Sequence, residues 1–275
     1  MSYSTNSYIG TPKEVPSYIK RLSICLTPNG FSFSRTAQQG ILLTFGDVSM
    51  DMNRTMSELT SDLKAFFVSN DISPFDFEDM QLVIPSDQYV WIPKALFDES
   101  SKDVYLKSVF TLPDGYGCFS SYNESVEAYN VFAANTGIET AFKIVLPGIE
   151  VYSQSSILAT PHLLDASAKV PVILLHQRQR MCDFLVCKDG KMLLSSSYEV
   201  SSDEERLFRA LELMKGLQVE DHQMTLFICG DVDRNTYESL CNYFPQIRIY
   251  SGRPLGYKNP EFQVLRAYQH VLVLS

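Results

Sequence analysis

Three neighbouring residues offer the clearest chance for chemistry: His176, Arg178 and Arg180 stand at and just after the end of an apolar run. Two arginines in a turn can hold an anion, because each guanidinium group is a planar fork of hydrogen-bond donors. A histidine can act as a ligand or a base near neutral pH. The same pattern also fits two solvated arginines beside a structural histidine, and the sequence leaves both interpretations open.

A second cluster is formed by Asp231 and Asp233, which could jointly hold a metal ion. Asp233, however, precedes an amphipathic run and is a preferred residue type for the N-cap of a helix. The acids of 203–205 likewise fall in the first turn of a predicted helix, where negative charge complements the helix dipole. These carboxylates therefore indicate helix starts at least as readily as a metal site.

Motifs for covalent or hydrolytic catalysis are absent from the sequence. It contains no Gly-x-Ser-x-Gly, no Walker-type Gly-Lys-Ser/Thr and no His-Glu-x-x-His. The 6 cysteines are scattered, with no Cys-x-x-Cys and no histidine at ligand spacing, which is typical of buried apolar residues. We expect neither a catalytic residue nor a metal ligand from these patterns.

Length and charge narrow the class of protein. The chain has 275 residues, with 23 Lys and Arg against 32 Asp and Glu and a net charge of −9. That balance disfavours a nucleic-acid binder, whose affinity depends on neutralising phosphates. Residues 1–20 are polar, without the apolar stretch of a secretory signal, and no later run approaches the roughly 20 apolar residues that cross a bilayer. We therefore expect a cytoplasmic protein without membrane insertion.

The apolar periodicity predicts the same order of elements, βββαβαβ, in each half of the chain. The first copy comprises a meander over 21–48, a helix from Asn53, a strand over 80–84, a helix opened by Ser121–Glu124 and a strand over 141–146. The second copy comprises a meander over 171–198, a helix after Ser202, a strand over 224–229, a helix capped by Asp233 and a strand over 246–250. Gly40 and Gly190 close the corresponding turn in the two copies.

Two copies of one unit normally pack as two lobes around a cleft. We predict a polar N-terminal segment over 1–20, a first lobe over 21–150 and a second lobe over 171–275 that ends in a helix from Asn259. The connecting segment over 151–170 is predicted to hold a helix over 157–168.

This tandem arrangement resembles the actin-like ATPase fold, in which two ribonuclease-H-like lobes flank a nucleotide cleft. Residues Leu82–Ser86 resemble the strand-then-proline segment of the first lobe in that superfamily, including its pilus-assembly and type II secretion members. The chain, over residues 20–255, also resembles a family of uncharacterised bacterial proteins, a domain of unknown function with this fold. The resemblance implies an α/β protein of two tandem ribonuclease-H-like lobes with a nucleotide site between them.

In that superfamily a carboxylate and a glycine-rich turn between the first two strands of each lobe hold Mg²⁺ and the phosphates. The resemblance assigns the first turn to 25–30, with Thr27 and Gly30, but the Asp is absent and Pro28 removes a backbone donor. It assigns the second turn to 176–180, with His176 and Arg178, which has neither carboxylate nor glycine.

The adenosine side of the site is retained in part. Residues 226–231 resemble the superfamily's apolar strand ending in paired glycines, where a base or ribose approaches the backbone. Gly230 matches, whereas Asp231 puts a carboxylate in place of the second glycine. The simpler alternative is that Gly230 and Asp231 only turn the strand into the helix capped by Asp233.

These departures lead to two functional hypotheses. The first is a non-catalytic binding or scaffolding protein with a degenerate nucleotide site, which binds another protein and needs no cofactor. The alternative is a nucleotide-dependent ATPase or phosphotransferase that binds ATP and Mg²⁺ in the cleft, with the metal held by other acids such as Asp231 or Asp47.

Overall fold

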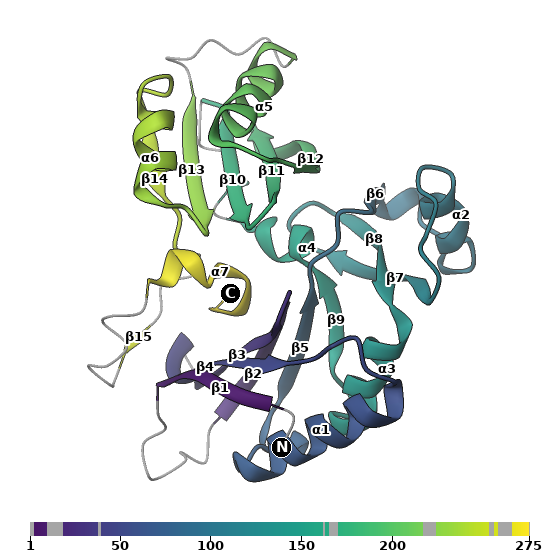
Figure 1. Cartoon of the computed structure of the whole chain (residues 1–275). Coiled ribbons are helices and arrows are strands. Elements are labelled where there is room, and N and C mark those ends of the chain that lie inside the picture. The colour runs from purple at the N-terminus through teal and green to yellow at the C-terminus, as the bar shows by residue number, and fades with distance from the viewer. Residues whose placement is uncertain are drawn as a thin grey trace.

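The computed structural model (Figure 1) consists of two lobes, each built on one sheet, and a smaller third sheet at the side of the first lobe. It describes residues 3–9, 19–37, 40–161, 163–164, 170–216, 224–252, 256–257 and 266–274. No helix among these residues is both long enough and apolar enough to span a bilayer.

The first lobe is built on a sheet in the strand order β1-β4-β3-β2-β5-β9, with β15 also pairing with β4. Its strands are β1 (Tyr3–Ile9), β2 (Ile19–Thr27), β3 (Gly30–Ala37), β4 (Ile41–Met50), β5 (Asp79–Ile84), β9 (Glu150–Ser153) and β15 (Gly256–Tyr257). β2, β3 and β4 are antiparallel neighbours, whereas β5 pairs in parallel with both β2 and β9. The predicted meander is therefore present.

The second lobe repeats this topology in the order β12-β11-β10-β13-β14. Its strands are β10 (Val172–Arg178), β11 (Met181–Lys188), β12 (Lys191–Glu199), β13 (Thr225–Gly230) and β14 (Ile247–Ile249). Gly40 and Gly190 occupy the same place before the third meander strand and have φ values of 71° and 74°. Because L-residues with a Cβ rarely adopt this conformation, glycine marks the equivalent turn in both copies.

Paired helices cover the outer face of each sheet. They are α1 (Met56–Ser69) and α3 (Thr136–Val145) in the first lobe, and α5 (Asp203–Gly216) and α6 (Arg234–Cys241) in the second. The predicted capping box opens α1, where Thr55 and Glu58 exchange side-chain and backbone hydrogen bonds. Leu63 and Phe142 of the first pair pack on Phe31 and Phe33, so each lobe has a core of its own.

Two predictions in the middle of the first lobe are wrong. Ser121–Glu124 does not open a helix, because it lies at the end of β7 (Tyr116–Asn123), which pairs with β8 (Ala128–Asn135). β8 is the central strand of the small sheet β6-β8-β7 and is buried on both faces, so its sequence lacks the alternation that marks a strand. The predicted strand over 141–146 belongs to α3, since a short apolar run does not distinguish a strand from a buried helix.

Three predicted boundaries also change. Tyr3–Ile9, predicted to lie in a polar segment outside the first lobe, pairs with β4 as a strand of its sheet. The strand that completes that sheet, β9, extends into the predicted connection and is followed by α4 (Gln154–Leu158). Within the predicted helix over 157–168, residues 159–161 and 163–164 are not helical, and 162 and 165–168 lie outside the described residues. The start of the predicted terminal helix at Asn259 lies outside the described residues.

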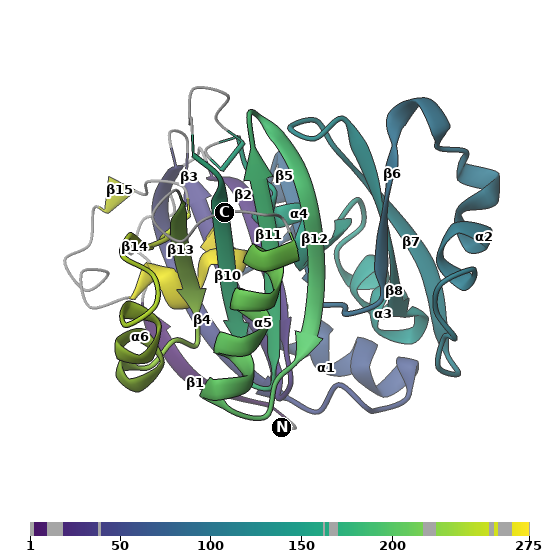
Figure 2. The same cartoon turned by 90° about the horizontal axis from the view of Figure 1, so that it is seen from above.

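The small sheet lies beside the first lobe, and Tyr89, Phe132 and Ala134 from it belong to the core of that lobe. Its first strand, β6 (Tyr89–Pro93), follows β5, and a short helix, α2 (Lys102–Lys107), packs against it before β7. Seen from above, the second lobe lies over the first sheet, and β6, β7, β8 and α2 lie to one side (Figure 2).

A third apolar core joins the two lobes. Its members come from the first sheet (Leu42, Phe45, Val83), from the second sheet (Leu174, Leu185, Cys229), and from α4 and α7 (Val271–Leu274). α7 lies between the sheets and packs against β2 and β3 (Figure 1). Because domains move freely only when little apolar surface joins them, this shared core holds the lobes in one arrangement.

We predict that the lobes unfold together. Phe45 is 1 % exposed in the shared core, whereas Phe75 is 94 % exposed. Phe45→Ala should cost about 3–5 kcal/mol of unfolding free energy, because it removes a buried ring and leaves a cavity. Calorimetry should show one transition that moves to lower temperature in Phe45→Ala and stays in place in Phe75→Ala. Two separate transitions in the native protein would contradict the shared core.

Candidate functional site

A cavity of about 790 Å³ lies between the lobes. The first lobe contributes the end of β2 with its turn, 25–28, and the segment after β5, 84–88. The second lobe contributes the end of β10 and its turn, 176–181, and the last part of the chain contributes 269–270 and 272–273. Binding sites of small molecules commonly have this size, so the cavity is the candidate site.

Four of the six predicted site residues line this cavity: Thr27, His176, Arg178 and Asp231. The tandem topology therefore brings both predicted phosphate turns and the residue after β13 to one place. Gly30 and Gly230 are not among the lining residues. The geometry around each of these two glycines gives another reason for their presence.

Gly30 and Gly230 are required by close backbone contacts. At Gly30, φ is 149° and an added Cβ would lie 2.0 Å from the carbonyl oxygen of Val48. At Gly230, φ is 85° and a Cβ would lie 2.1 Å from the carbonyl oxygen of Gln177. The same carbonyl accepts a hydrogen bond from the Asp231 N–H at 2.9 Å. Gly230 thus turns β13 toward α6, which favours the simpler of the two sequence interpretations.

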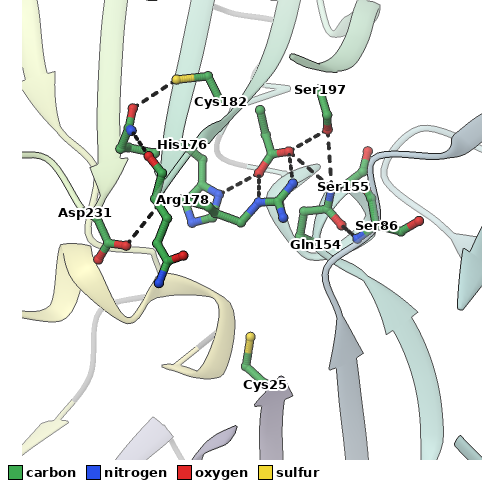
Figure 3. A network of polar contacts seen from close by, with 12 residues as sticks. Cys25, Ser86, Gln154, Ser155, His176, Arg178, Cys182, Ser197 and Asp231 are labelled. Carbon is green, nitrogen blue, oxygen red and sulfur yellow. Dashed lines mark hydrogen bonds and ion pairs between the residues drawn. The ribbon is translucent and has the colours of Figure 1, made fainter. Parts of the chain in front are cut away.

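The strongest electrostatic feature beside the cavity is Asp183, a residue of β11 that no sequence motif marks. Arg178 donates to both carboxylate oxygens, from Nε to Oδ2 and from Nη2 to Oδ1, each at 2.7 Å. His176 Nδ1 lies 2.8 Å from Oδ2, and Ser197 Oγ donates to Oδ1 at 2.5 Å. Figure 3 shows these side chains converging on the one carboxylate.

The strands impose this convergence. His176 and Asp183 are directly opposed in the antiparallel pair β10–β11, and Arg178 lies two residues further along the same face of β10. The opposite face of these strands packs on α5 and α6, so the polar residues can only point toward the other lobe. In the sequence, Asp183 is marked only as a charged residue within the apolar stretch 181–187. The residues that it contacts are decided by the register in which β10 and β11 pair.

The ionised form of Asp183 is strongly stabilised. Burial raises the pKa of this carboxyl, but the Arg178 charge and the hydrogen bonds from His176 and Arg178 outweigh burial and hold the pKa well below its usual range. The result is a closed ion pair in which Arg178 is already neutralised. The anion that Arg178 binds is therefore the Asp183 carboxylate of the protein itself.

A glutamine extends this network to the first lobe. Gln154, at the start of α4, is fully buried and donates from Nε2 to the Ser86 carbonyl at 2.5 Å and to Asp183 Oδ1 at 3.2 Å. Its Oε1 accepts from the Ser86 N–H at 2.7 Å. Because Ser86 follows β5, one amide group ties the end of the first sheet to the buried charge of the second lobe.

The cavity holds few groups suited to nucleophilic or metal chemistry. Burial raises the pKa of the Cys25 thiol to about 12, so this cysteine stays protonated. Within the described ranges, no group of three or more His, Cys, Asp or Glu is placed to hold a metal ion. Asp47 and Asp231 both line the cavity near His270, whose pKa is lowered by burial against the opposing effect of these two acids.

We expect Gly230→Ala to destabilise the fold rather than to fill a ligand pocket. Gly148 is the matched control, because its φ of 89° is similar but nothing lies within 4 Å of an added Cβ. Both substitutions strain the backbone by about 1–2 kcal/mol. Only Gly230→Ala adds the collision with Gln177, so urea unfolding should show a further loss of about 1–3 kcal/mol. Equal losses in the two variants would contradict this role.

We also expect Asp183→Asn to lower the unfolding free energy at neutral pH by about 3–5 kcal/mol, because Arg178 is left without its counter-charge. Asp189→Asn, at an exposed turn position, should have little effect. Since the folded-state pKa lies below the unfolded value of about 3.9, the contribution is complete well above that pH and is lost as the pH falls below about 4. The difference between native protein and Asp183→Asn should therefore shrink in acid. A constant difference would refute the ion pair.

Comparison with solved structures identifies the fold. A Bacteroides thetaiotaomicron protein, described as having an actin-like ATPase fold and unknown function, is 20% identical with a TM-score of 0.73, covering 88% of this chain and 94% of that chain. A structure described as the PilM-PilN type IV pilus biogenesis complex is 10% identical with a TM-score of 0.56, covering 94% of this chain and 97% of that chain. The protein therefore has the actin-like ATPase fold, as the order of its elements predicted.

Sequence comparison identifies the family. Among curated proteins, none matches the chain. Residues 14–247 match the family described as protein of unknown function (DUF3822). This match covers most of both lobes and the connection between them, and it agrees with the resemblance inferred from the sequence. The chain therefore belongs to this family, DUF3822.

Proposed function

We propose that this protein is a non-catalytic, cytoplasmic binding or scaffolding protein, in which the cavity between the lobes serves a protein partner rather than a nucleotide. The observation that carries the proposal is the bidentate pair of Arg178 with Asp183. It occupies the cation of the second phosphate turn with an internal carboxylate, so a phosphate would have to compete with a buried, optimally placed anion.

The first phosphate turn supports the same conclusion. Pro28 lies in the cavity wall and has no backbone N–H to offer a phosphate. Asp47, Asp87 and Asp231 also line the cavity, and their carboxylates would repel a triphosphate unless a metal ion intervened. Arg180 is the cation that remains at the rim after Arg178 is paired, and its side chain is exposed.

The shared core between the lobes argues against a cycle of nucleotide-driven closure. Phe45 of the first sheet and Leu174 of the second belong to one apolar cluster that includes α7. Separating the lobes would expose this cluster to water, at about 25 cal/mol for each Å² of apolar surface. A fixed arrangement of two lobes suits a rigid binding surface.

One structural neighbour adds an indication of the partner class. The second structure compared above is a complex of PilM with PilN, and this chain shares its fold over nearly its whole length. Fold likeness alone does not transfer a partner. The complex is nevertheless an example of a protein of this fold that binds another protein, which is the mode of action that we propose.

The alternative is an ATPase or phosphotransferase that uses ATP and Mg²⁺. The observation in its favour is that Asp47 and Asp231, the acids proposed to hold the metal, line the same cavity as Thr27 and His176. The cavity is also large enough for a nucleotide. This alternative requires bound Mg²⁺ to neutralise the carboxylates that would otherwise repel the triphosphate.

Calorimetric titration with ATP and Mg²⁺ separates the two functions. We expect no binding up to millimolar nucleotide, no shift in the unfolding temperature and no phosphate release. Asp47→Asn and Asp231→Asn are the matched variants, because the alternative needs these carboxylates. Submillimolar binding with slow hydrolysis that either variant abolishes would overturn the proposal and establish the alternative.

A further inference from the structure

The edge strand β12 of the second sheet is paired on one side only. Within the described part of the chain, β11 is the element that lies alongside it, and Figure 2 shows β12 at the margin of its sheet. The strand is 9 residues long, and its register with β11 is regular from Leu194 to Glu199. An edge strand of this length presents a row of backbone groups to any strand that approaches it.

The register shows which backbone groups face away from the sheet. The Val200 N–H donates to the Arg180 carbonyl at 2.7 Å. Because every second residue of an antiparallel strand directs both of its backbone groups toward the same neighbour, Ser196 also faces β11. Ser195 and Ser197 then present their N–H and carbonyl groups on the open side, where no strand pairs with them among the described residues.

This edge is held rigid and carries none of the usual obstacles to pairing. Residues 192–198 include neither a proline nor a charged residue, the two residue types that commonly protect an edge strand. On the inner face, Ser195 Oγ lies 3.1 Å from the Tyr89 hydroxyl, and Ser197 Oγ donates to Asp183 at 2.5 Å. Because β12 is already ordered, a strand that pairs with it would have to order only itself.

Charges at the two ends of β12 determine which strand fits. Lys191 and Glu199 are exposed, and neither forms an ion pair within the described ranges. An added antiparallel strand would continue the antiparallel series β10, β11 and β12, with its start beside Glu199 and its end beside Lys191. Opposite charges on facing residues stabilise strand pairing and like charges oppose it. The matching strand therefore begins with a basic residue and ends with an acidic one.

The position of the small sheet distinguishes two occupants with this charge pattern. β12 itself begins with Lys191 and ends with Glu199, so a second copy of the chain would meet the charge requirement. The small sheet, however, lies on the same side of the second lobe as the free edge of β12 (Figure 2). A two-fold axis beside β12 would bring the small sheets of two copies into the same space. A single extended segment avoids this collision.

We propose that β12 is a docking edge for an extended segment of a partner protein, which adds an antiparallel strand to the second sheet with a basic residue beside Glu199 and an acidic residue beside Lys191. Hydrogen bonds to the main chain of Ser195 and Ser197 supply affinity, and the end charges fix the direction of the segment. Residues 191–199 do not line the cavity, so this edge is a contact surface in addition to the binding role proposed above.

Two peptides of identical composition provide the test on the whole chain. The matching probe has the 9 residues of β12's length, with lysine first, glutamate last and alternating threonine and valine between blocked termini. Its control exchanges the lysine and the glutamate. We expect the matching peptide to bind about tenfold more tightly, because the exchange turns two attractions into repulsions. In hydrogen exchange followed by NMR, the N–H groups of Ser195 and Ser197 should become protected, while that of Ser196 should not change.

A charge-exchanged variant locates the binding. Lys191→Glu combined with Glu199→Lys alters two exposed side chains, keeps the net charge and should reverse the preference between the peptides. The matched control is Arg234→Glu combined with Glu238→Arg, an exposed pair on α6 that lies outside β12, and it should keep the native preference. Equal affinity for the two peptides, or the native preference in the β12 variant, would overturn the proposal.

The remaining outcomes identify other occupants. Tighter binding of the control peptide would indicate a parallel strand and contradict the antiparallel one. Protection of Ser195 and Ser197 in the protein alone, rising with its concentration and lost in Lys191→Glu, would assign the edge to a second copy and overturn a partner segment. Failure of the matching peptide to bind at millimolar concentration also overturns the docking edge, and it leaves the role of the cavity to the titration with ATP and Mg²⁺.

Discussion

The arrangement of the second lobe depends on one buried negative charge. Asp183 is surrounded by donors, Arg178 and His176 from the neighbouring strand and Ser197 from the other, so that the cost of removing a carboxylate from water is offset by hydrogen bonds and an opposite charge. Gln154 carries the same network into the first lobe. A single carboxylate thus orients the cavity-facing side chains and couples them to the junction of the lobes.

The apolar core shared by the lobes complements this polar network. α7 lies between the two sheets with all of its residues buried, and the Val273 carbonyl accepts a hydrogen bond from the buried Ser34 hydroxyl at 2.6 Å. In a fold whose two lobes commonly frame a cleft, the end of this chain fills part of the space between them. What remains open is the cavity beside His176, whose shape is set by a fixed junction and not by a hinge.

The site keeps the geometry of the fold and changes its chemistry. Both turns that face the cleft are in the places that the topology dictates, and Thr27, His176, Arg178 and Asp231 meet at one cavity. Pro28 has no backbone N–H to offer a phosphate, and Arg178 is paired with Asp183. The cavity wall instead includes the carboxylates of Asp47, Asp87 and Asp231. The fold fixes the positions of these residues and the side chains fix their charge, so the fold alone does not determine the ligand.

The sequence by itself determined the repeated βββαβαβ order and the second meander, because turns such as Gly40 and Gly190 and apolar alternation are local properties. The sequence patterns misassigned β8 and α3. These elements are buried on more than one side, so their apolar residues do not show the spacing typical of a strand or a helix. Only the tertiary structure decided the partners of Asp183, the packing role of Gly230 and the place of α7. Those features depend on strand register and on contacts between residues far apart in the chain, which no local pattern encodes.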